Sequence, residues 1–221
     1  MSLDSVLKII ESACERSGRK TSEVQLLPVS KGQSVENILE KLSDPSFPRC
    51  LGENYFQELS TKKRLLLESY KIEWHYLGNL QSRKIAEIAS AVHTIHSVSR
   101  VKELEMIAKL ELINIPYIYL QFNVSKELTK SGFDLGEAER VKELSLSLGL
   151  EKNLVGLMTM ASPLKNNNEA QVRKEFASLR KIRDQYFPGL GLSMGMSADA
   201  HLAIEEGSSC VRIGTQLFGA R

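Results

Sequence analysis

The stretch LGLSMGMSADAHLAIEEGSSCVRIGT, residues 190–215, contains a complete strand–helix–strand unit. Residues 190–194 and 210–214 form short apolar runs that are typical of buried strands. Between them, Ser197 is placed to cap a helix and Gly207 to end it. A strand, a helix and a second strand in this order predict a parallel sheet.

The same alternation continues along the rest of the chain. A first helix is expected where Leu3, Val6 and Ile10 recur at helical spacing, and Gly18 ends it. Strands are predicted at residues 24–31, 49–53, 72–77, 92–96, 117–123, 154–158, 190–194 and 210–214. Helices are predicted between them, at residues 35–42, 56–67, 81–91, 101–108, 134–144, 169–186 and 197–207.

Eight strands and seven intervening helices, with one extra helix at the N-terminus, predict an α/β protein. A doubly wound open sheet and a closed (β/α)8 TIM barrel both fit this order. Eight repeats favour the barrel, and no glycine-rich dinucleotide motif follows the first strand. The polar segment 162–168 is interpreted as a loop within the barrel, so residues 1–221 are predicted to form a single domain.

Composition excludes several functional classes. The 221 residues are 42% hydrophobic and 25% charged, which is ordinary for a soluble globular domain. A net charge of +2 favours neither nucleic acid nor a membrane as partner, and no segment approaches the roughly 18 consecutive apolar residues of a spanning helix. The N-terminus is not a signal peptide, and the three separated cysteines argue against disulfides or a metal site. A cytoplasmic protein is therefore expected.

Two segments at the carboxyl ends of predicted strands suggest a phosphate site. In a barrel the functional site lies at this end of the strands, and loops seven and eight commonly bind phosphate. Residues 193–197 form a turn of small residues before a helix, and residues 212–215 add backbone donors beside it. Oriented amides, hydroxyls and the helix dipole would hold a phosphate there. Gly195 and Gly214 are equally explained by tight turns alone.

Lys31 ends the first predicted strand, and partial loss of water at that position would favour the neutral amine that attacks carbonyls. A solvated lysine at a strand end is the simpler explanation of Lys31 considered alone. A lysine and a phosphate site in one barrel mouth, however, fit an aldehyde that carries a phosphate. Pyridoxal 5′-phosphate (PLP) is the prominent biological example.

Arg212 bears on what such a cofactor could do. An arginine facing the pyridine nitrogen keeps that nitrogen unprotonated and weakens the ring as an electron sink. An ion pair inside the barrel is the alternative explanation for Arg212. The four histidines show no ligand spacing and are interpreted as structural or surface residues, and Cys210 is interpreted as a small core residue.

Several ordered motifs, taken together, resemble the pyridoxal phosphate homeostasis protein family, which is related to the N-terminal barrel of alanine racemase. The matching motifs are LPVSK at 27–31, GENYFQE at 52–58, WHYLGNLQ at 74–81, KSG at 130–132, GLM at 156–158, SMGMSAD at 193–199, VRIGT at 211–215 and FGAR at 218–221. Gly32 and Gln33 depart from the family pattern, where a threonine and a basic residue are usual, and this change bears on how the lysine is gated or PLP is released. Arg83 stands where asparagine is common and is interpreted as peripheral.

The resemblance implies a single-domain barrel of the alanine racemase type that holds PLP as a Schiff base on Lys31. It implies that Asn54 lies near the cofactor ring and that Arg212 faces the pyridine nitrogen. It further implies cofactor-binding positions at the phosphate end, namely Ser193, Met194, Ser197, Gly214 and Thr215. Lys130 matches a lysine with a possible role in transient cofactor transfer.

The predicted function is PLP binding and intracellular PLP homeostasis, by a monomer without a catalytic residue of its own. PLP-dependent apo-enzymes are candidate recipients. The alternative is an amino-acid racemase or another small PLP-dependent enzyme, which needs two bases. Alanine racemase takes the second base from another domain of its partner subunit, and this sequence ends just past the last predicted strand. A nucleic-acid-binding or partner-binding barrel is a third, weaker alternative.

Overall fold

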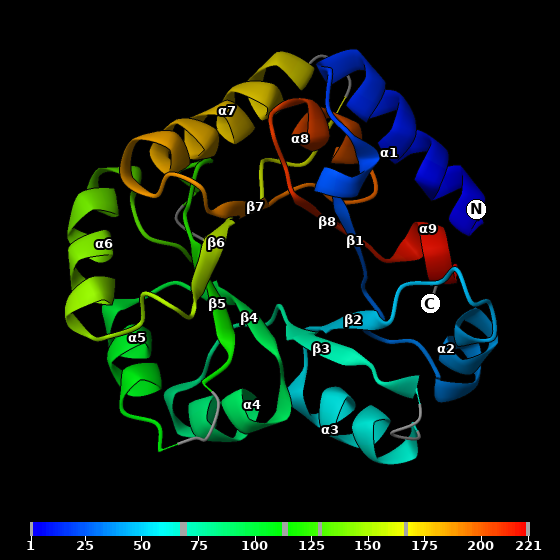
Figure 1. The fold of residues 1–221 in the computed structure, drawn as a ribbon, viewed down its shortest axis with the longest axis horizontal. Helices are drawn as coiled ribbons and strands as arrows, with labels where there is room; N and C mark the ends of the chain where they lie inside the picture. Colours follow the sequence, from blue (N-terminus) through cyan, green and yellow to red (C-terminus); the bar gives the residue numbers. More distant parts are fainter. Residues whose placement is uncertain (1, 67–69, 112–114, 128–129, 166–167, 220–221) are drawn as a thin grey trace.

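The computed structural model describes residues 2–66, 70–111, 115–127, 130–165 and 168–219, and its core is a barrel of eight parallel strands (Figure 1). The strands are β1 (Gln25–Pro28), β2 (Cys50–Glu53), β3 (Glu73–Tyr76), β4 (Thr94–Val98), β5 (Tyr117–Gln121), β6 (Leu154–Met158), β7 (Gly191–Ser193) and β8 (Cys210–Ile213). Each of β3 to β7 pairs with its neighbours in the sequence, β2 pairs with β3, and β8 pairs with β7 and β1. A single parallel bridge between Val29 and Gly52 joins β1 to β2. The predicted (β/α)8 barrel is confirmed.

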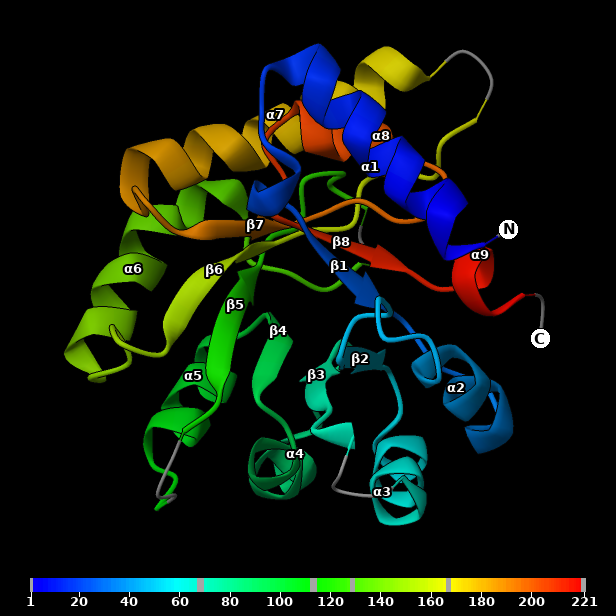
Figure 2. The ribbon, with the colours of Figure 1, turned by 45° about the vertical axis from the view of Figure 1, so that its right-hand side comes forward.

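Helices surround the barrel, as the apolar faces in the sequence predicted (Figures 1 and 2). They are α1 (Leu3–Ser17), α2 (Val35–Leu42), α3 (Phe56–Leu65), α4 (Ile85–Ala91), α5 (Val101–Ala108), α6 (Ala138–Ser147), α7 (Glu169–Tyr186), α8 (Ala200–Glu205) and α9 (Thr215–Phe218). The extra N-terminal helix α1 lies across α8, and its Val6, Ile10 and Cys14 are buried. None of the helices in the described part of the chain has both the length and the apolar character needed to cross a membrane.

Two separate sets of apolar side chains stabilise the fold. The larger set fills the space between the helices and the outer face of the sheet, and Leu51, Ile95 and Leu157 are among its fully buried members. The smaller set lies apart from it and consists of Leu27, Cys50 and Cys210, with Leu77 packed against them. All three cysteines of the chain are buried free thiols. Cys210 is therefore a core residue, as predicted.

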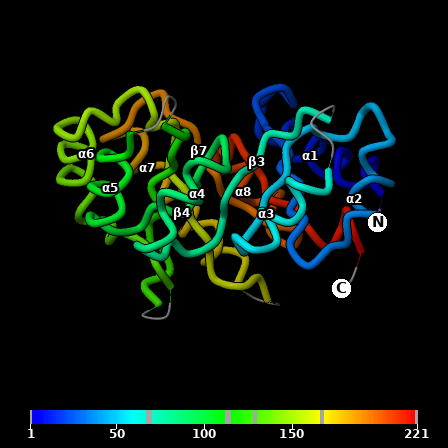
Figure 3. The backbone as a smooth tube through the Cα atoms, turned by 90° about the horizontal axis from the view of Figure 1, so that it is seen from below, coloured from blue at the N-terminus to red at the C-terminus, as the bar shows by residue number. Residues whose placement is uncertain are grey.

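The carboxyl ends of the strands open on one side of the barrel. In Figure 3 the segments that follow β5 (green) and β6 (yellow) extend below the barrel, on the side where the chain ends. The loops after β1, β2, β7 and β8 carry most of the predicted site residues. The topology therefore places those residues at one end of the molecule.

Several local predictions need correction. Ser197 does not cap α8: the N-cap is Asp199, whose Oδ1 accepts a 2.6 Å hydrogen bond from the Met196 amide. The predicted helix 81–91 begins as a 3-10 turn at Ser82–Lys84 before α4. The short helix α9 was not predicted. Leu67 of the predicted helix 56–67, residues 166–167 of the predicted loop and residues 220–221 of the last motif lie outside the described residues.

Candidate functional site

A cavity of about 390 Å³ opens at the carboxyl ends of the strands. Its lining residues are Val29, Lys31, Gln33, Asn54, Leu77, Met158, Met160, Met196, Ser197, Ala198, Arg212, Gly214 and Thr215. The structure thus brings together six residues that the sequence singled out from four separate segments. They are Lys31, Asn54, Ser197, Arg212, Gly214 and Thr215. The apolar part of the lining, including three methionines, was not predicted.

Lys31 occupies a tight turn directly after the end of β1. The Gln33 amide donates to the Ser30 carbonyl at 3.0 Å and closes the turn, with Lys31 at its second position. Gly32, at the third position, has φ = +70°, a backbone conformation that favours glycine. No hydrogen bond or ion pair to the Lys31 amine occurs within the described residues, so the amine faces the cavity without a protein partner.

Arg212 lies on β8 and is only 5% exposed. Its guanidinium donates from Nη1 to the Ser193 hydroxyl and from Nη2 to the Thr159 carbonyl, both at 2.8 Å. It makes no ion pair with any described residue, so the alternative of an internal ion pair is wrong for this part of the chain. Burial lowers the pKa of the Arg212 guanidinium, and the nearby Asp199 carboxylate acts in the opposite direction.

A chain of buried hydrogen bonds continues from Arg212 into the barrel. The Ser193 hydroxyl lies 2.9 Å from Nδ1 of His96, and Nε2 of His96 lies 2.9 Å from Nδ1 of His75. The His96 ring stacks on Tyr119 with 4.3 Å between ring centroids. Burial lowers the pKa of both histidines, that of His75 to about 4, so both rings are neutral at physiological pH. The sequence indicated structural roles for these histidines but not their link to Arg212.

Ser193 and Met194 do not line the cavity. Both are fully buried, Ser193 beneath Arg212 and Met194 in the outer core. Gly195 follows with φ = +95°, and a Cβ at this position would lie 2.6 Å from the Cβ of Ala203, so the chain packs tightly on α8 there. The next turn brings Ser197 into the cavity wall, where the Gln216 side chain donates to the Ser197 carbonyl at 3.1 Å. Loops seven and eight therefore form one wall.

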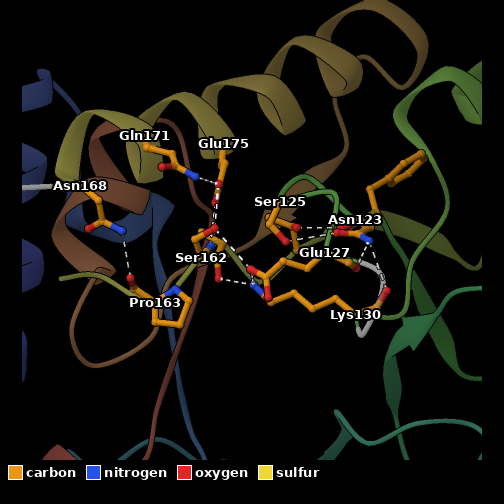
Figure 4. A network of polar contacts seen from close by, with 12 residues as sticks. Asn123, Ser125, Glu127, Lys130, Ser162, Pro163, Asn168, Gln171 and Glu175 are labelled. Carbon is orange, nitrogen blue, oxygen red and sulfur yellow. Dashed lines mark hydrogen bonds and ion pairs between the residues drawn. The ribbon is translucent and has the colours of Figure 1, made fainter.

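Lys130 also lies outside the cavity lining. Its ammonium pairs with Glu127 at 2.8 Å and donates to the Ala161 carbonyl at 3.0 Å. Ser162 continues this network to α7, because its amide and hydroxyl donate to the two carboxylate oxygens of Glu175 at 2.6 and 2.8 Å. Figure 4 shows Lys130 extending toward Ser162 across the gap between the two loops. Lys130 thus connects the loops that follow β5 and β6.

Comparison with known proteins agrees with this geometry. Residues 8–221 match the family model described as alanine racemase, N-terminal domain. The pyridoxal phosphate homeostasis protein of Aquifex aeolicus is 38% identical, and the match covers 99% of this chain and 96% of that protein. This chain belongs to the pyridoxal phosphate homeostasis protein family. The corresponding Escherichia coli protein of the family is 33% identical over 96% of this chain and 92% of its own length.

Solved structures of the family and of its distant relatives share the barrel. PipY of Synechococcus elongatus, solved with PLP bound, superposes with a TM-score of 0.74 at 32% identity, covering 96% of this chain and all of PipY. Alanine racemase of Acinetobacter baumannii superposes with a TM-score of 0.71 at only 14% identity, covering 99% of this chain and 58% of the racemase. At that identity the racemase match supports the fold alone.

Proposed function

We propose that this protein binds PLP reversibly, as a Schiff base on Lys31, and serves in intracellular PLP homeostasis. The observation that carries the proposal is one cavity that joins an unpartnered lysine amine to a buried arginine and a wall of small polar residues. PLP bound to PipY and the names of the curated relatives support the same ligand.

The cavity suits a ligand of this kind. Its volume of about 390 Å³ lies within the range of about 300–1,000 Å³ that is typical of small-molecule sites. The direct hydrogen-bond acceptors of the buried Arg212 among the described residues are neutral, so an electron-rich ring nitrogen would find a strong donor there. A Cβ added to Gly214 would lie 3.2 Å from the Val29 carbonyl oxygen. Glycine at this position therefore lets the two backbone segments approach each other without a side chain between them.

The polar lining residues that the sequence singled out then have distinct roles in PLP binding. Bound PLP supplies an aldehyde for amine attachment and a pyridine ring that can withdraw electrons. Lys31 would provide the amine, and Arg212 would donate to the pyridine nitrogen and so limit electron withdrawal by the ring. Asn54, directly after β2, lines the cavity where it would contact the ring. The wall that contains Ser197, Gly214 and Thr215 would hold the phosphate.

Three other residues contribute from outside the cavity. Ser193 acts through Arg212, because its hydroxyl accepts one of the two hydrogen bonds that fix the guanidinium. Met194 supports the wall from the outer core. Lys130 is proposed for transient cofactor transfer, and that role requires its ammonium to leave Glu127 first.

The proposal extends to the cellular role. A single-domain, monomeric carrier in the cytoplasm would lower the concentration of the free aldehyde and deliver it to PLP-dependent apo-enzymes. Racemase activity is disfavoured because Lys31 is the only described lining residue suited to act as a base, whereas racemisation needs two. Incubation of the PLP-loaded protein with L-alanine and other L-amino acids tests this choice. Sustained formation of a D-isomer would replace the carrier proposal by the racemase.

The lysine assignment has a direct test. PLP is added to wild type, to Lys31→Ala and to Lys130→Ala, and the visible absorbance of the lysine-bound cofactor is recorded. Borohydride reduction and peptide mass spectrometry then identify the labelled lysine. Wild type and Lys130→Ala should show the absorbance with the label at Lys31, and Lys31→Ala should lose it completely. Retention of the full absorbance in Lys31→Ala would show that another lysine carries PLP.

A further inference from the structure

We propose that helix α3 positions Lys31 for PLP binding through an ion cluster formed by Glu53, Glu58 and Lys62. The inference rests on the proposed function, because it assigns a positioning role toward the PLP-binding lysine. It concerns residues that lie behind the cavity and do not line it. They contact the turn that carries Lys31 on both sides of that residue.

The first set of contacts is made to Ser30, the residue before Lys31. Its hydroxyl donates to Oε1 of Glu53 at 2.6 Å, and its carbonyl accepts from the Lys62 ammonium at 2.7 Å. Its amide donates to the Gly52 carbonyl at 3.0 Å. Ser30 is fully buried. All of its polar groups are therefore held in place.

The second contact is made to Gly32, the residue after Lys31. Its amide donates to Oε2 of Glu58 at 2.7 Å, an oxygen that also pairs with Lys62 at 3.1 Å. Lys31 thus sits between two anchored peptide units, while its own amine stays at the cavity. Backbone anchoring of this kind limits where the amine can reach without occupying it.

Lys62 organises the cluster. It is 4% exposed, and its three ammonium protons match three oxygen acceptors: the Ser30 carbonyl and one carboxylate oxygen each from Glu53 and Glu58. A buried lysine with this set of partners is an unsuitable attachment site for PLP. Its contacts instead converge on the Lys31 turn, which a lysine serving only the stability of α3 would not require.

The glycine at position 32 explains why the turn needs such support. The backbone angle of +70° strains most residues other than glycine, whereas glycine also adopts many other conformations. A turn that contains glycine loses more freedom on ordering, so it benefits from external anchors. Glu58 and Lys62 lie four residues apart on α3 and present both anchors from one face of the helix.

The experiment measures how firmly the lysine-bound cofactor is held. PLP-loaded wild type, Glu58→Ala and Glu58→Gln are mixed with hydroxylamine, and the loss of the visible absorbance is followed over time. Glu58→Ala should lose the cofactor about fivefold faster, because the Gly32 amide loses its acceptor. Glu58→Gln keeps an acceptor oxygen and should stay within about twofold of wild type. Ser30→Ala, which releases the other side of the turn, should also accelerate the loss.

Glu169→Ala is the matched control, since Glu169 also pairs with a basic residue four positions on, in the first turn of α7 far from Lys31. It should react at the wild-type rate, and thermal unfolding checks that all variants are folded. Equal rates for folded Glu58→Ala, Ser30→Ala and wild type, with the label still at Lys31, would refute the positioning role. Loss of the Lys31 label in wild type would instead refute the proposed function.

Discussion

Lys31 and Lys130 both follow strands at the same end of the barrel, but their ammonium groups have opposite surroundings. Lys31 lines the cavity, and the described residues give its amine no partner. Lys130 pairs with Glu127 and donates to the Ala161 carbonyl (Figure 4). In the first case the protein holds the backbone on either side of the lysine, whereas in the second it holds the ammonium itself. Proximity to the barrel mouth therefore does not determine which lysine is available to react.

The carboxylates near the two lysines differ in the same way. Burial raises the pKa of Glu53, which anchors the Lys31 turn from inside the protein. The hydrogen bond from Lys130 lowers the pKa of Glu127, which is exposed to solvent. Buried Glu53 and Lys62 thus support the Lys31 turn, and a partly exposed ion pair restrains Lys130. Exposed pairs are weak and exchange readily, so Lys130 can be released more easily than the Lys31 turn can be moved.

Acid should have the largest effect, because it should lower the stability of the barrel interior beneath the Lys31 site while the Glu127–Lys130 pair stays intact. Burial lowers the pKa of His75 from about 6.5 to about 4. Between these values the unfolded chain binds more protons than the folded one, so stability should fall as the pH drops from about 6.5 to about 4, by about 3 kcal/mol. The Glu127–Lys130 pair should persist over most of this range, because the pKa of Glu127 is lowered.

Urea unfolding at pH 7, 5 and 4 measures this loss, and PLP absorbance in the same samples reports on the site above the histidines. His75→Gln should flatten the pH dependence, while His201→Gln, on α8 and outside the barrel interior, should not. A wild-type stability that is constant from pH 7 to pH 4 would contradict the account of buried neutral histidines.

Removal of a hydroxyl should have a smaller effect, on PLP affinity, and only in the region of Lys31. Thr215 lines the cavity at the proposed phosphate end, and Ser125 contacts Asn123 in the Lys130 region. Thr215→Ala should weaken PLP binding about tenfold, the effect of losing one hydrogen bond to a charged group. Ser125→Ala should leave the dissociation constant unchanged. Equilibrium titration with PLP compares the two variants, and equal affinities would place the phosphate elsewhere.

Release of Lys130 should give the smallest effect. Glu127→Ala removes the carboxylate that pairs with Lys130, so borohydride labelling of Lys130 in the presence of PLP should rise about threefold, as expected for loss of an exposed ion pair. Labelling of Lys31 should not change. Glu137→Ala is the control, because it breaks another ion pair between residues three positions apart, Glu137 and Arg140. An unchanged Lys130 label would show that the Ala161 carbonyl alone restrains the ammonium.

Much of the fold was predictable because its signals are local. Apolar runs and helical spacing located all eight strands, and the capping pair Asp134 and Glu137 was correctly assigned, since both of its hydrogen bonds form. Ser197 is not the cap of α8, because the helix begins at Ala200 and Asp199 occupies the N-cap position, with its carboxylate bound to the Met196 amide ahead of the helix. A sequence pattern does not decide between two candidate caps that lie two positions apart.

The site was predictable only where residues end strands. Lys31 and Arg212 could be placed in one cavity because parallel strands share their carboxyl end. Ser193 and Met194 were assigned to the same site, but Arg212 covers Ser193 from the cavity, and Met194, the next residue, packs in the outer core. The link from Ser193 to His96 joins residues 97 positions apart, so no spacing in the sequence indicates it.

The neutral partners of Arg212 have one more consequence. Since a hydroxyl and a carbonyl accept the hydrogen bonds of the guanidinium, no described counter-ion in direct contact with it must be displaced when a ligand acceptor approaches. Dissolved salt screens exposed charges over about 10 Å at 0.1 M but reaches buried groups poorly. The hydrogen bond from Arg212 to the ring should therefore depend little on ionic strength, whereas the electrostatic attraction of the phosphate to the cavity mouth should weaken as salt is added. Ionic strength would then alter how quickly the ligand arrives more than how its ring is held.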